Sequence, residues 1–393
     1  MDGAPTRALC AGLFVFALWS GASAAENSDP GVTPDAILFG QAAAFTGPAA
    51  ALGLEIRQGI LAAFEEANRQ GGVGERQLKL ISYDDGYEPE QSVEATRKLI
   101  ENDKVFALIG AVGTPTSMAS EPMAIKAGLP FIGAFTGAEF LREPFNAQVV
   151  NIRASYFQET EALVSILAGE RGFTRIAVLY QDDAFGHAGL TGVSDALARR
   201  GMTIVSQASF ERNTTAVKMA SLAIRQGNPQ AVVMIGPYKP CAEFVRLARR
   251  MGMDTQFAAI SFLGSDAFAN DLGREAAGTI VTQVMPPPAD VSLPLVQGYR
   301  AALKALDPTA TPNAVSLEGY VAARLTIAAL ERIDGEPTRA GFLAAIRGAS
   351  FDLGGFPLVY GVSDSRGSNR VFPTVIDPDG SSRPIAEEKK LHG

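Results

Sequence analysis

The sequence predicts an α/β protein built from two doubly wound lobes. Strand-like and helix-like segments alternate in two successive series, the first ending at Thr136 and the second beginning after Asn151. The strands are short apolar runs bounded by glycine or polar residues, as strands buried in a parallel sheet are. Two β-α-β-α series in succession form two doubly wound lobes rather than one barrel.

The first series begins at Ile37. Its opening helix has Leu54, Ile60 and Phe64 on one face and ends at Gly71-Gly72, since glycine readily adopts the left-handed backbone that closes a helix. The expected strands are Ile37–Gln41, Leu78–Tyr83, Val105–Val112 and Pro130–Thr136, and the expected helices are Leu52–Gln70, Glu88–Asn102 and Thr114–Ala127. The segment Asn146–Tyr156 has no strong helical pattern, and we expect it to cross between the lobes.

The second series repeats the alternation. Its expected strands are Ile176–Tyr180, Thr203–Ser206, Ala231–Ile235 and Phe257–Ile260, and its expected helices are Gln158–Arg171, Phe185–Arg200, Ala216–Gln226 and Pro240–Met251. A strand at Thr279–Val284, helices at Leu293–Leu306, Val315–Ile333 and Arg339–Arg347, and a strand at Val371–Ile376 follow. We expect residues 34–150 with about 281–350 to form lobe 1, and residues 151–280 with about 351–380 to form lobe 2.

The N-terminus is typical of a secretory signal peptide. Arg7 precedes the apolar run Ala8–Trp19, and small residues follow up to Ala25. The run is shorter than the roughly 20 residues of a membrane-spanning helix, so we expect residues 1–25 to be cleaved after Ala24 or Ala25. Cleavage would leave Cys241 as the single cysteine and place a soluble protein in the periplasm, without an internal disulfide.

Composition argues against several classes of function. The formal net charge is −8 with a pI near 5.1, and no stripe of Lys and Arg suggests a nucleic-acid partner. The two histidines belong to no metal-ligand or nucleophile motif, so we predict no metal, no cofactor and no enzymatic activity. The pairs Asp84-Asp85 and Asp182-Asp183 lie between a strand and a helix, where aspartate commonly caps the helix.

The segment Val105–Thr136 carries the strongest functional signal. Thr114 precedes Pro115 after a buried strand, which predicts a helix start with a hydroxyl cap and free amides. Thr136 ends the next strand at the same edge of the sheet, where open α/β sheets bind ligands. The positive end of a helix favours an anion such as a carboxylate; the alternative is that Thr114 only caps its helix.

Several short motifs follow one another in a recognisable order: Phe45-Thr46-Gly47-Pro48, Tyr83-Asp84-Asp85, Ile109-Gly110 before Thr114, Tyr180-Gln181-Asp182-Asp183-Ala184-Phe185-Gly186, and Ile235-Gly236 with Tyr238. In the order of these motifs, the mature chain resembles the leucine/isoleucine/valine-binding branch of the type I periplasmic binding proteins that serve ABC transporters. The resemblance implies two lobes joined by a hinge of three crossovers, which close on a small ligand.

The resemblance also implies which residues hold that ligand. Thr114 would bind a carboxylate, with the Ala134 carbonyl and Thr136 completing the polar shell. Phe185 and Tyr238 would line the pocket from the second lobe. Leu52 falls in the first loop of the pocket, and Tyr156 follows the first crossover. Together with Ser261, which is discussed next, they make eight expected ligand-binding residues: Leu52, Thr114, Ala134, Thr136, Tyr156, Phe185, Tyr238 and Ser261.

Ser261 departs from the family pattern. Amino-acid binders of this family carry a glutamate there for the ligand ammonium, and a serine cannot neutralise that charge. Either another acid substitutes, with Asp266 and Glu318 nearest by family position, or the ligand is an aromatic or aliphatic acid or an amide. The resemblance therefore implies a monomeric binding subunit of an ABC importer, with a small-molecule ligand and a membrane permease as partners. The alternatives are a sensor of the same fold that signals to a receptor, and an enzyme.

Overall fold

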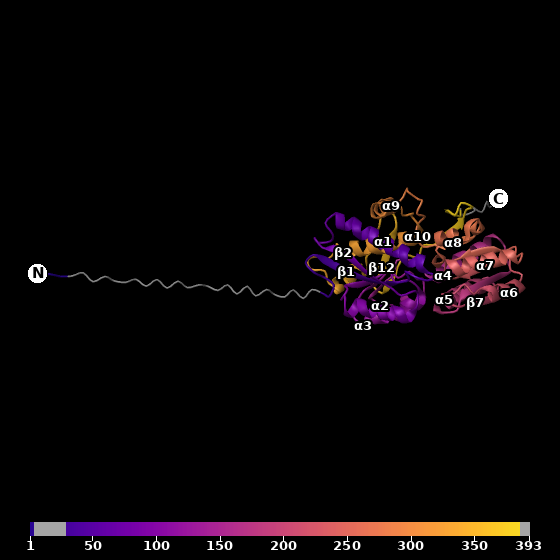
Figure 1. The fold of residues 1–393 in the computed structure, drawn as a ribbon, viewed down its shortest axis with the longest axis horizontal. Helices are drawn as coiled ribbons and strands as arrows, with labels where there is room; N and C mark the ends of the chain where they lie inside the picture. The colour runs from indigo at the N-terminus through magenta and orange to yellow at the C-terminus, as the bar shows by residue number, and fades with distance from the viewer. Residues whose placement is uncertain (4–28, 386–393) are drawn as a thin grey trace.

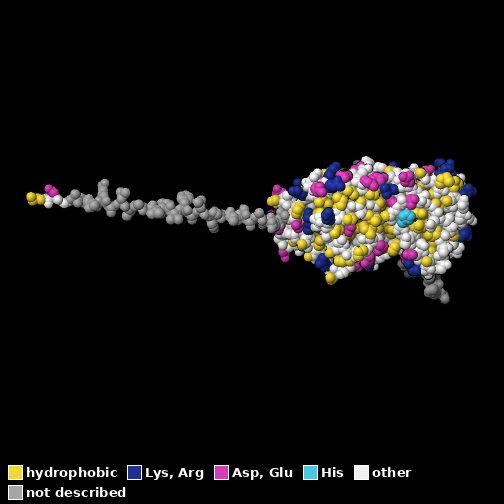
Figure 2. Space-filling view, turned by 90° about the horizontal axis from the view of Figure 1, so that it is seen from below, with side chains coloured by type: hydrophobic (Ala, Val, Ile, Leu, Met, Phe, Trp, Pro, Cys, Tyr) yellow, Lys and Arg dark blue, Asp and Glu magenta, His cyan; other side chains and the backbone are white. Residues whose placement is uncertain are grey.

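The computed structural model describes residues 1–3 and 29–385, and these form two lobes side by side (Figure 1). The expected signal peptide and Cys10 fall largely on residues 4–28, outside the described residues. Within the described part of the chain, no helix is long and apolar enough to cross a membrane. On the face in Figure 2, Lys and Arg side chains are scattered among acidic ones and form no continuous basic surface.

The first lobe has a parallel sheet of five strands in the order β2-β1-β3-β4-β5. The strands are β1 Ala36–Ala43, β2 Gln77–Asp84, β3 Ala107–Ile109, β4 Phe131–Ile132 and β5 Val149–Val150, connected by α1 Ala50–Arg69, α2 Pro89–Glu101 and α3 Thr114–Lys126. The helix α1 buries Leu52, Ile56 and Ile60 against the core, whereas Leu54, expected on that face, is exposed.

The second lobe has a sheet of seven strands in the order β15-β14-β10-β9-β8-β6-β7. Its parallel strands are β6 Ile176–Gln181, β7 Gln207–Phe210, β8 Ala231–Ile235, β9 Gln256–Ala259 and β10 Ile280–Gln283, and its helices are α4 Tyr156–Val164, α5 Ala184–Ala198, α6 Lys218–Gln226, α7 Tyr238–Arg250 and α8 Ser265–Leu272. A π-helical turn, η2 Ser165–Glu170, extends α4. The predicted class, two doubly wound α/β lobes, is confirmed.

One predicted strand of this lobe was wrong. Residues 203–206 were expected to form it, but β7 begins at Gln207, and its register on β6 runs from Val178↔Gln207 to Gln181↔Phe210. The chain approaches the sheet edge before it pairs regularly with β6. The Val205 amide already donates to the Ile176 carbonyl, but regular pairing starts at Gln207, and the first buried side chain of the strand is Phe210. The apolar residues that suggested a strand at 203–206 therefore belong to the segment that leads into β7.

Helices from late in the chain complete the first lobe. These are α9 Pro294–Leu306, α10 Ala314–Leu330 and α11 Arg339–Ile346. The backbones of α1 and α10 nearly touch, since a Cβ added to Gly59 would lie 1.8 Å from the Ser316 carbonyl oxygen. The short helices η1 Glu139–Leu141, η3 Ser261–Leu263 and η4 Gly273–Ala276 complete the set of described helical elements.

The tail of the chain divides between the lobes. The strands β11 Ser350–Asp352, β12 Pro357–Gly361 and β13 Asp364–Gly367 form a small antiparallel sheet beside β5. Asn151 donates to the Ser365 carbonyl at 2.9 Å, and Tyr360 donates to the Asn151 carbonyl at 2.7 Å. This part of residues 351–380, expected in lobe 2, therefore lies against lobe 1, because its backbone and tyrosine pair with the strand end at Asn151.

The remaining strands, β14 Phe372–Ile376 and β15 Ser382–Pro384, join the second sheet: β14 pairs antiparallel with β10, and β15 pairs antiparallel with β14. The chain consequently passes between the two lobes after β5, after β10 and between β13 and β14. Three connections at one end restrain sliding and leave rotation about the connections as the simple relative motion of the lobes.

Candidate functional site

Thr114 and Thr136 meet at the carboxyl edge of the first sheet. Helix α3 begins after Gly113, whose φ is 100°, so Thr114 is the first helical residue and does not cap the helix. Gly113 is required there, because a Cβ would lie 2.1 Å from the Tyr87 ring. Thr114 Oγ1 instead lies 2.7 Å from Thr136 Oγ1. The expectation of a threonine cap was wrong, because the hydroxyl pairs with Thr136 at the sheet edge.

Three buried hydroxyls, those of Thr114, Thr136 and Tyr156, lie together at this edge. Only one of the two threonine protons can lie between the two Oγ1 atoms, and Thr136 Oγ1 also accepts a hydrogen bond from Ala138 N at 3.3 Å. The Ala134 carbonyl is occupied by Thr136 N at 2.8 Å. Tyr156, the first residue of α4, is 1% exposed, and its hydroxyl lies beside the hydroxyls of Thr136 and Thr114. Burial raises the pKa of Tyr156, although Arg153 and the nearby Thr136 and Thr114 hydroxyls oppose this rise.

Arg153 is the centre of a buried ion cluster between the lobes. Its side chain is fully buried; Nη2 lies 2.9 Å from Glu159 Oε1, and Nη1 lies 3.2 Å from Glu318 Oε1. Burial lowers the pKa of Arg153, but the attraction of Glu318 and Glu159 outweighs it and raises the pKa above its usual value. The guanidinium lies 5.0 Å from the centre of the Phe135 ring and 5.9 Å from that of Tyr156, and its Nε has no acceptor among the described residues.

Ser261 belongs to this ion cluster. Its hydroxyl donates to Glu159 at 3.0 Å and accepts from Arg153, while its backbone amide donates to Glu159 at 2.8 Å. Of the two acids considered as substitutes at this position, Glu318 faces the cluster. Burial raises the pKa of Glu318 to about 7, against the opposing effect of Arg153.

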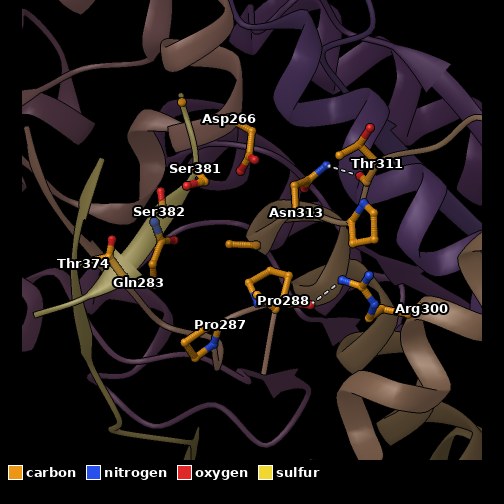
Figure 3. A pocket seen from close by; sticks show the side chains of 14 residues that line it. Asp266, Gln283, Pro287, Pro288, Arg300, Thr311, Asn313, Thr374, Ser381 and Ser382 are labelled. Carbon is orange, nitrogen blue, oxygen red and sulfur yellow. Dashed lines mark hydrogen bonds between the residues drawn. The ribbon is translucent and has the colours of Figure 1, made fainter. Parts of the chain in front are cut away.

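Asp266, the other acid considered, lies away from the cluster and lines a cavity of about 320 Å³ beside the crossover after β10. Figure 3 shows Asp266, Ser381 and Asn313 around one side of this cavity and Pro287 and Pro288 across from them. Burial raises the pKa of Asp266 to about 6. Burial, together with the charge of Asp266, raises the pKa of Glu55 on α1 to about 8.

Aromatic rings from both lobes surround the polar groups. The Phe262 ring, on η3, lies 4.5 Å from Phe185 and 5.3 Å from Phe135, measured between ring centres. Tyr87 lies 6.0 Å from Phe262, and Tyr156 lies 5.4 Å from Phe185. The structure therefore brings Thr114, Thr136, Tyr156, Phe185 and Ser261 into one cluster between the lobes.

Leu52 and Tyr238 contact the opposite lobe at positions of their own. A Cβ on Gly264 would lie 2.6 Å from a methyl carbon of Leu52, so the side chain of Leu52 packs on the backbone of the second lobe. Tyr238 begins α7, and its hydroxyl accepts a hydrogen bond from Ala51 N at 3.4 Å. Both residues thus line the interface between the lobes.

Polar pairs join the lobes directly, two at the partly exposed rim and one, between Gln181 and Tyr87, fully buried. Arg212 Nη2 lies 2.8 Å from Glu88 Oε2, Asn213 Nδ2 donates to the Gly86 carbonyl at 2.9 Å, and Gln181 Nε2 donates to the Tyr87 hydroxyl at 3.2 Å. Of the two aspartate pairs, the second caps its helix as expected, through Asp183 and the amides of α5. The first does not cap α2; its Asp84 instead accepts from Phe45 N at 2.7 Å.

The sequence analysis missed Arg153, Glu159 and Phe262. Arg153 lies in the crossover segment, where no motif distinguishes it, and Glu159 resembles an ordinary helical acid. An apolar-flanked arginine next to a lobe crossover was the available signal. Among residues 1–3 and 29–385, no group of His, Cys, Asp and Glu is arranged to hold a metal ion.

Solved structures and curated relatives resemble this chain. A possible leucine/isoleucine/valine-binding protein from Rhodopirellula baltica is 38% identical with a TM-score of 0.86, covering 93% of this chain and 100% of that one. A substrate-binding periplasmic protein from Ralstonia solanacearum is 29% identical with a TM-score of 0.83, covering 89% and 100%.

Among curated proteins, the leucine-, isoleucine-, valine-, threonine-, and alanine-binding protein of Pseudomonas aeruginosa is 24% identical over 249 residues, 63% of this chain and 66% of that one. Two further curated relatives, an amino acid binding protein of Pseudomonas aeruginosa and Leu/Ile/Val-binding protein homolog 7 of Brucella melitensis, are matched over only 25% and 43% of their own lengths. A family model described as periplasmic binding protein matches residues 36–381.

Proposed function

Because this chain belongs to the periplasmic binding protein family, we propose that it is the extracytoplasmic binding subunit of an ABC importer for an amino acid or a related small carboxylate. The relatives named above support the branch that the motifs suggested. The observation that carries the proposal is the cluster of buried donors between the lobes, at Thr114, Thr136, Tyr156 and Arg153.

The proposed mechanism follows from how these donors are placed. The threonine pair and the start of α3 belong to the first lobe, whereas Phe185 and Phe262 approach from the second lobe. A carboxylate bound to the first lobe would therefore be enclosed when the second lobe rotates onto it. The closed pair of lobes then presents one continuous surface to the membrane permease, which recognises the closed form.

The test is binding followed by transport. Purified mature protein should be stabilised by a small carboxylate; at 100 times the dissociation constant the stabilisation is about 2.7 kcal/mol. The loaded protein should then stimulate the ATPase of the cognate permease reconstituted in liposomes. Stabilisation by a solute without stimulation of any ABC permease would favour a sensor, and failure of every solute to bind would contradict the proposal.

A further inference from the structure

The cavity of about 320 Å³ beside the crossover after β10 is separate from the cluster between the lobes. Its walls come from α8 and β10 of the second lobe, from residues 287–289 of the crossover, and from residues 311–314 at the start of α10. The space between this cavity and the cluster, bordered by Gln283, Ser261 and Glu318, has no room for a water molecule. The cavity is therefore a compartment of its own, at the small end of the range of about 300–1,000 Å³ for ligand sites.

Asp266 presents an unpaired carboxyl group to this cavity. In Figure 3 the carboxyl group points toward the middle of the space. Among the described residues, Asp266 forms no ion pair and receives no hydrogen bond from any other residue. Burial raises the pKa of Asp266 only to about 6, so the group is ionised at neutral pH. A shielded carboxylate without a partner is costly, and a bound cation would remove that cost.

The polar side chains beside Asp266 direct their donors into the protein. Four donors already have acceptors: Gln283 Nε2 donates to Ser265 at 2.6 Å, Asn313 Nδ2 to the Thr311 carbonyl at 3.3 Å, the Thr374 hydroxyl to the Val281 carbonyl at 2.8 Å, and the Ser381 hydroxyl to Asp379 at 2.7 Å. Gln283 Oε1, in contrast, receives no hydrogen bond among the described residues. The polar wall therefore offers mainly acceptors, which suits a ligand that carries donors.

The groups that face Asp266 from the first lobe do not supply its missing partner. The charged and titratable ones are Glu55 on α1, and Tyr299 and Arg300 on α9. Glu55 and Tyr299 carry no positive charge. Arg300 is exposed at the edge of the cavity, and its guanidinium donates to the Pro288 carbonyl at 3.0 Å instead of pairing with Asp266 (Figure 3).

We propose that this cavity binds a small organic ammonium ion, with the ammonium group on Asp266 and an apolar tail against Pro287 and Pro288. A primary ammonium has three donors for the free acceptors of the polar wall. The two prolines lie across the cavity from Asp266 and offer an apolar surface to the tail (Figure 3). The inference goes beyond the proposed function and does not depend on it, because this cavity shares no residue with the cluster between the lobes.

Calorimetry with the mature protein and two matched probes tests the inference. Pentylamine is a primary ammonium ion at pH 7.5, and 1-pentanol has the same tail without the charge. Pentylamine should bind at least about tenfold more tightly, because a hydrogen bond to a charged group is stronger than one between neutral groups.

A variant at Asp266 links this preference to the cavity. Asp266→Asn keeps the shape of the side chain and removes its charge, so pentylamine should bind roughly ten- to a hundredfold more weakly. Asp195→Asn is the control, because Asp195 is exposed on α5, does not line the cavity, and changes the net charge by the same amount. It should leave the affinity for pentylamine unchanged, and thermal unfolding should show that both variants are folded.

The dependence of affinity on pH gives a second measurement on the unmodified protein. Below a pH of about 6, Asp266 takes up a proton while an aliphatic amine, with a pKa near 10, stays charged. The affinity for pentylamine should therefore fall as the pH drops from 7.5 to 5, and Asp266→Asn should not show this fall.

Three results would overturn the inference: no binding of pentylamine, equal binding of pentylamine and 1-pentanol, or unchanged affinity for pentylamine in Asp266→Asn. Each would leave the proposed function intact, since that function is tested by the binding of carboxylates and amino acids at the cluster between the lobes.

Discussion

Replacing Thr114 by valine removes one hydroxyl from the sheet edge while keeping the shape of the side chain. The hydroxyl lies 2.7 Å from Thr136 Oγ1 and does not cap its helix. The loss of a neutral buried hydrogen bond should lower the free energy of unfolding by about 1 kcal/mol. A hydrogen bond to a charged ligand group contributes about 1.5–3 kcal/mol, so carboxylate affinity should fall roughly ten- to a hundredfold.

Calorimetry and thermal unfolding of the same samples separate the two effects. Thr326→Val is a matched control, because Thr326 is also fully buried and makes one hydrogen bond, to the Ala322 carbonyl at 2.8 Å. It should lower stability by a similar amount without changing affinity. If Thr114→Val and the control bind the ligand equally well, the threonine pair does not contact the carboxylate.

Three further predictions concern pH, the rim and the helix contact in lobe 1. Burial raises the pKa of Glu55 from 4.5 to about 8, so the folded protein keeps a proton that the unfolded chain loses; stability should fall as pH rises between these values, and Glu55→Gln should flatten the dependence of Tm on pH. Arg212→Ala removes the partly exposed ion pair with Glu88, so the affinity for the carboxylate ligand should fall only about two- to fivefold, and by less at high salt. Calorimetry at two salt concentrations measures this, and an equal loss of affinity at both would contradict it. Gly59→Ala should lower the free energy of unfolding by about 1–3 kcal/mol, because α10 leaves no room for a methyl group. Gly298→Ala is the control: its added Cβ would lie 3.2 Å from the Tyr320 hydroxyl and meet no other atom within 4 Å, so denaturant unfolding should be nearly unchanged.

Most elements of both sheets could be predicted because buried parallel strands have a local signature. The run Ala231–Ile235 was located to the residue, since it is apolar throughout and fully buried. The edge strand β7 was misplaced because only one of its four residues, Phe210, is buried. The part of the tail with β11–β13 was assigned to the wrong lobe because its placement depends on hydrogen bonds to Asn151, far away in the sequence.

The site was predictable only where a motif marks it. Strand ends and Pro115 predicted that Thr114 and Thr136 lie at one edge of the sheet, where their hydroxyls are 2.7 Å apart, although the role of Thr114 as a cap was wrong. Arg153 and Glu159 could not be found in this way, because their importance comes from burial and from partners that are 102 to 165 residues distant, at Ser261 and Glu318. The resemblance to a family placed Ser261 at the interface, but only the structure shows that its hydroxyl is occupied.

The central claim is that a small carboxylate draws the two lobes together, and a distance measurement between the lobes tests it most directly. Cysteines introduced at Glu101 on α2 and Met219 on α6 can carry spin labels, since both positions are exposed and the native Cys241 is buried. Without ligand, the distance distribution should include longer separations; saturating carboxylate should collapse it to the single separation of the structure. An identical distribution with and without a bound ligand would contradict the account.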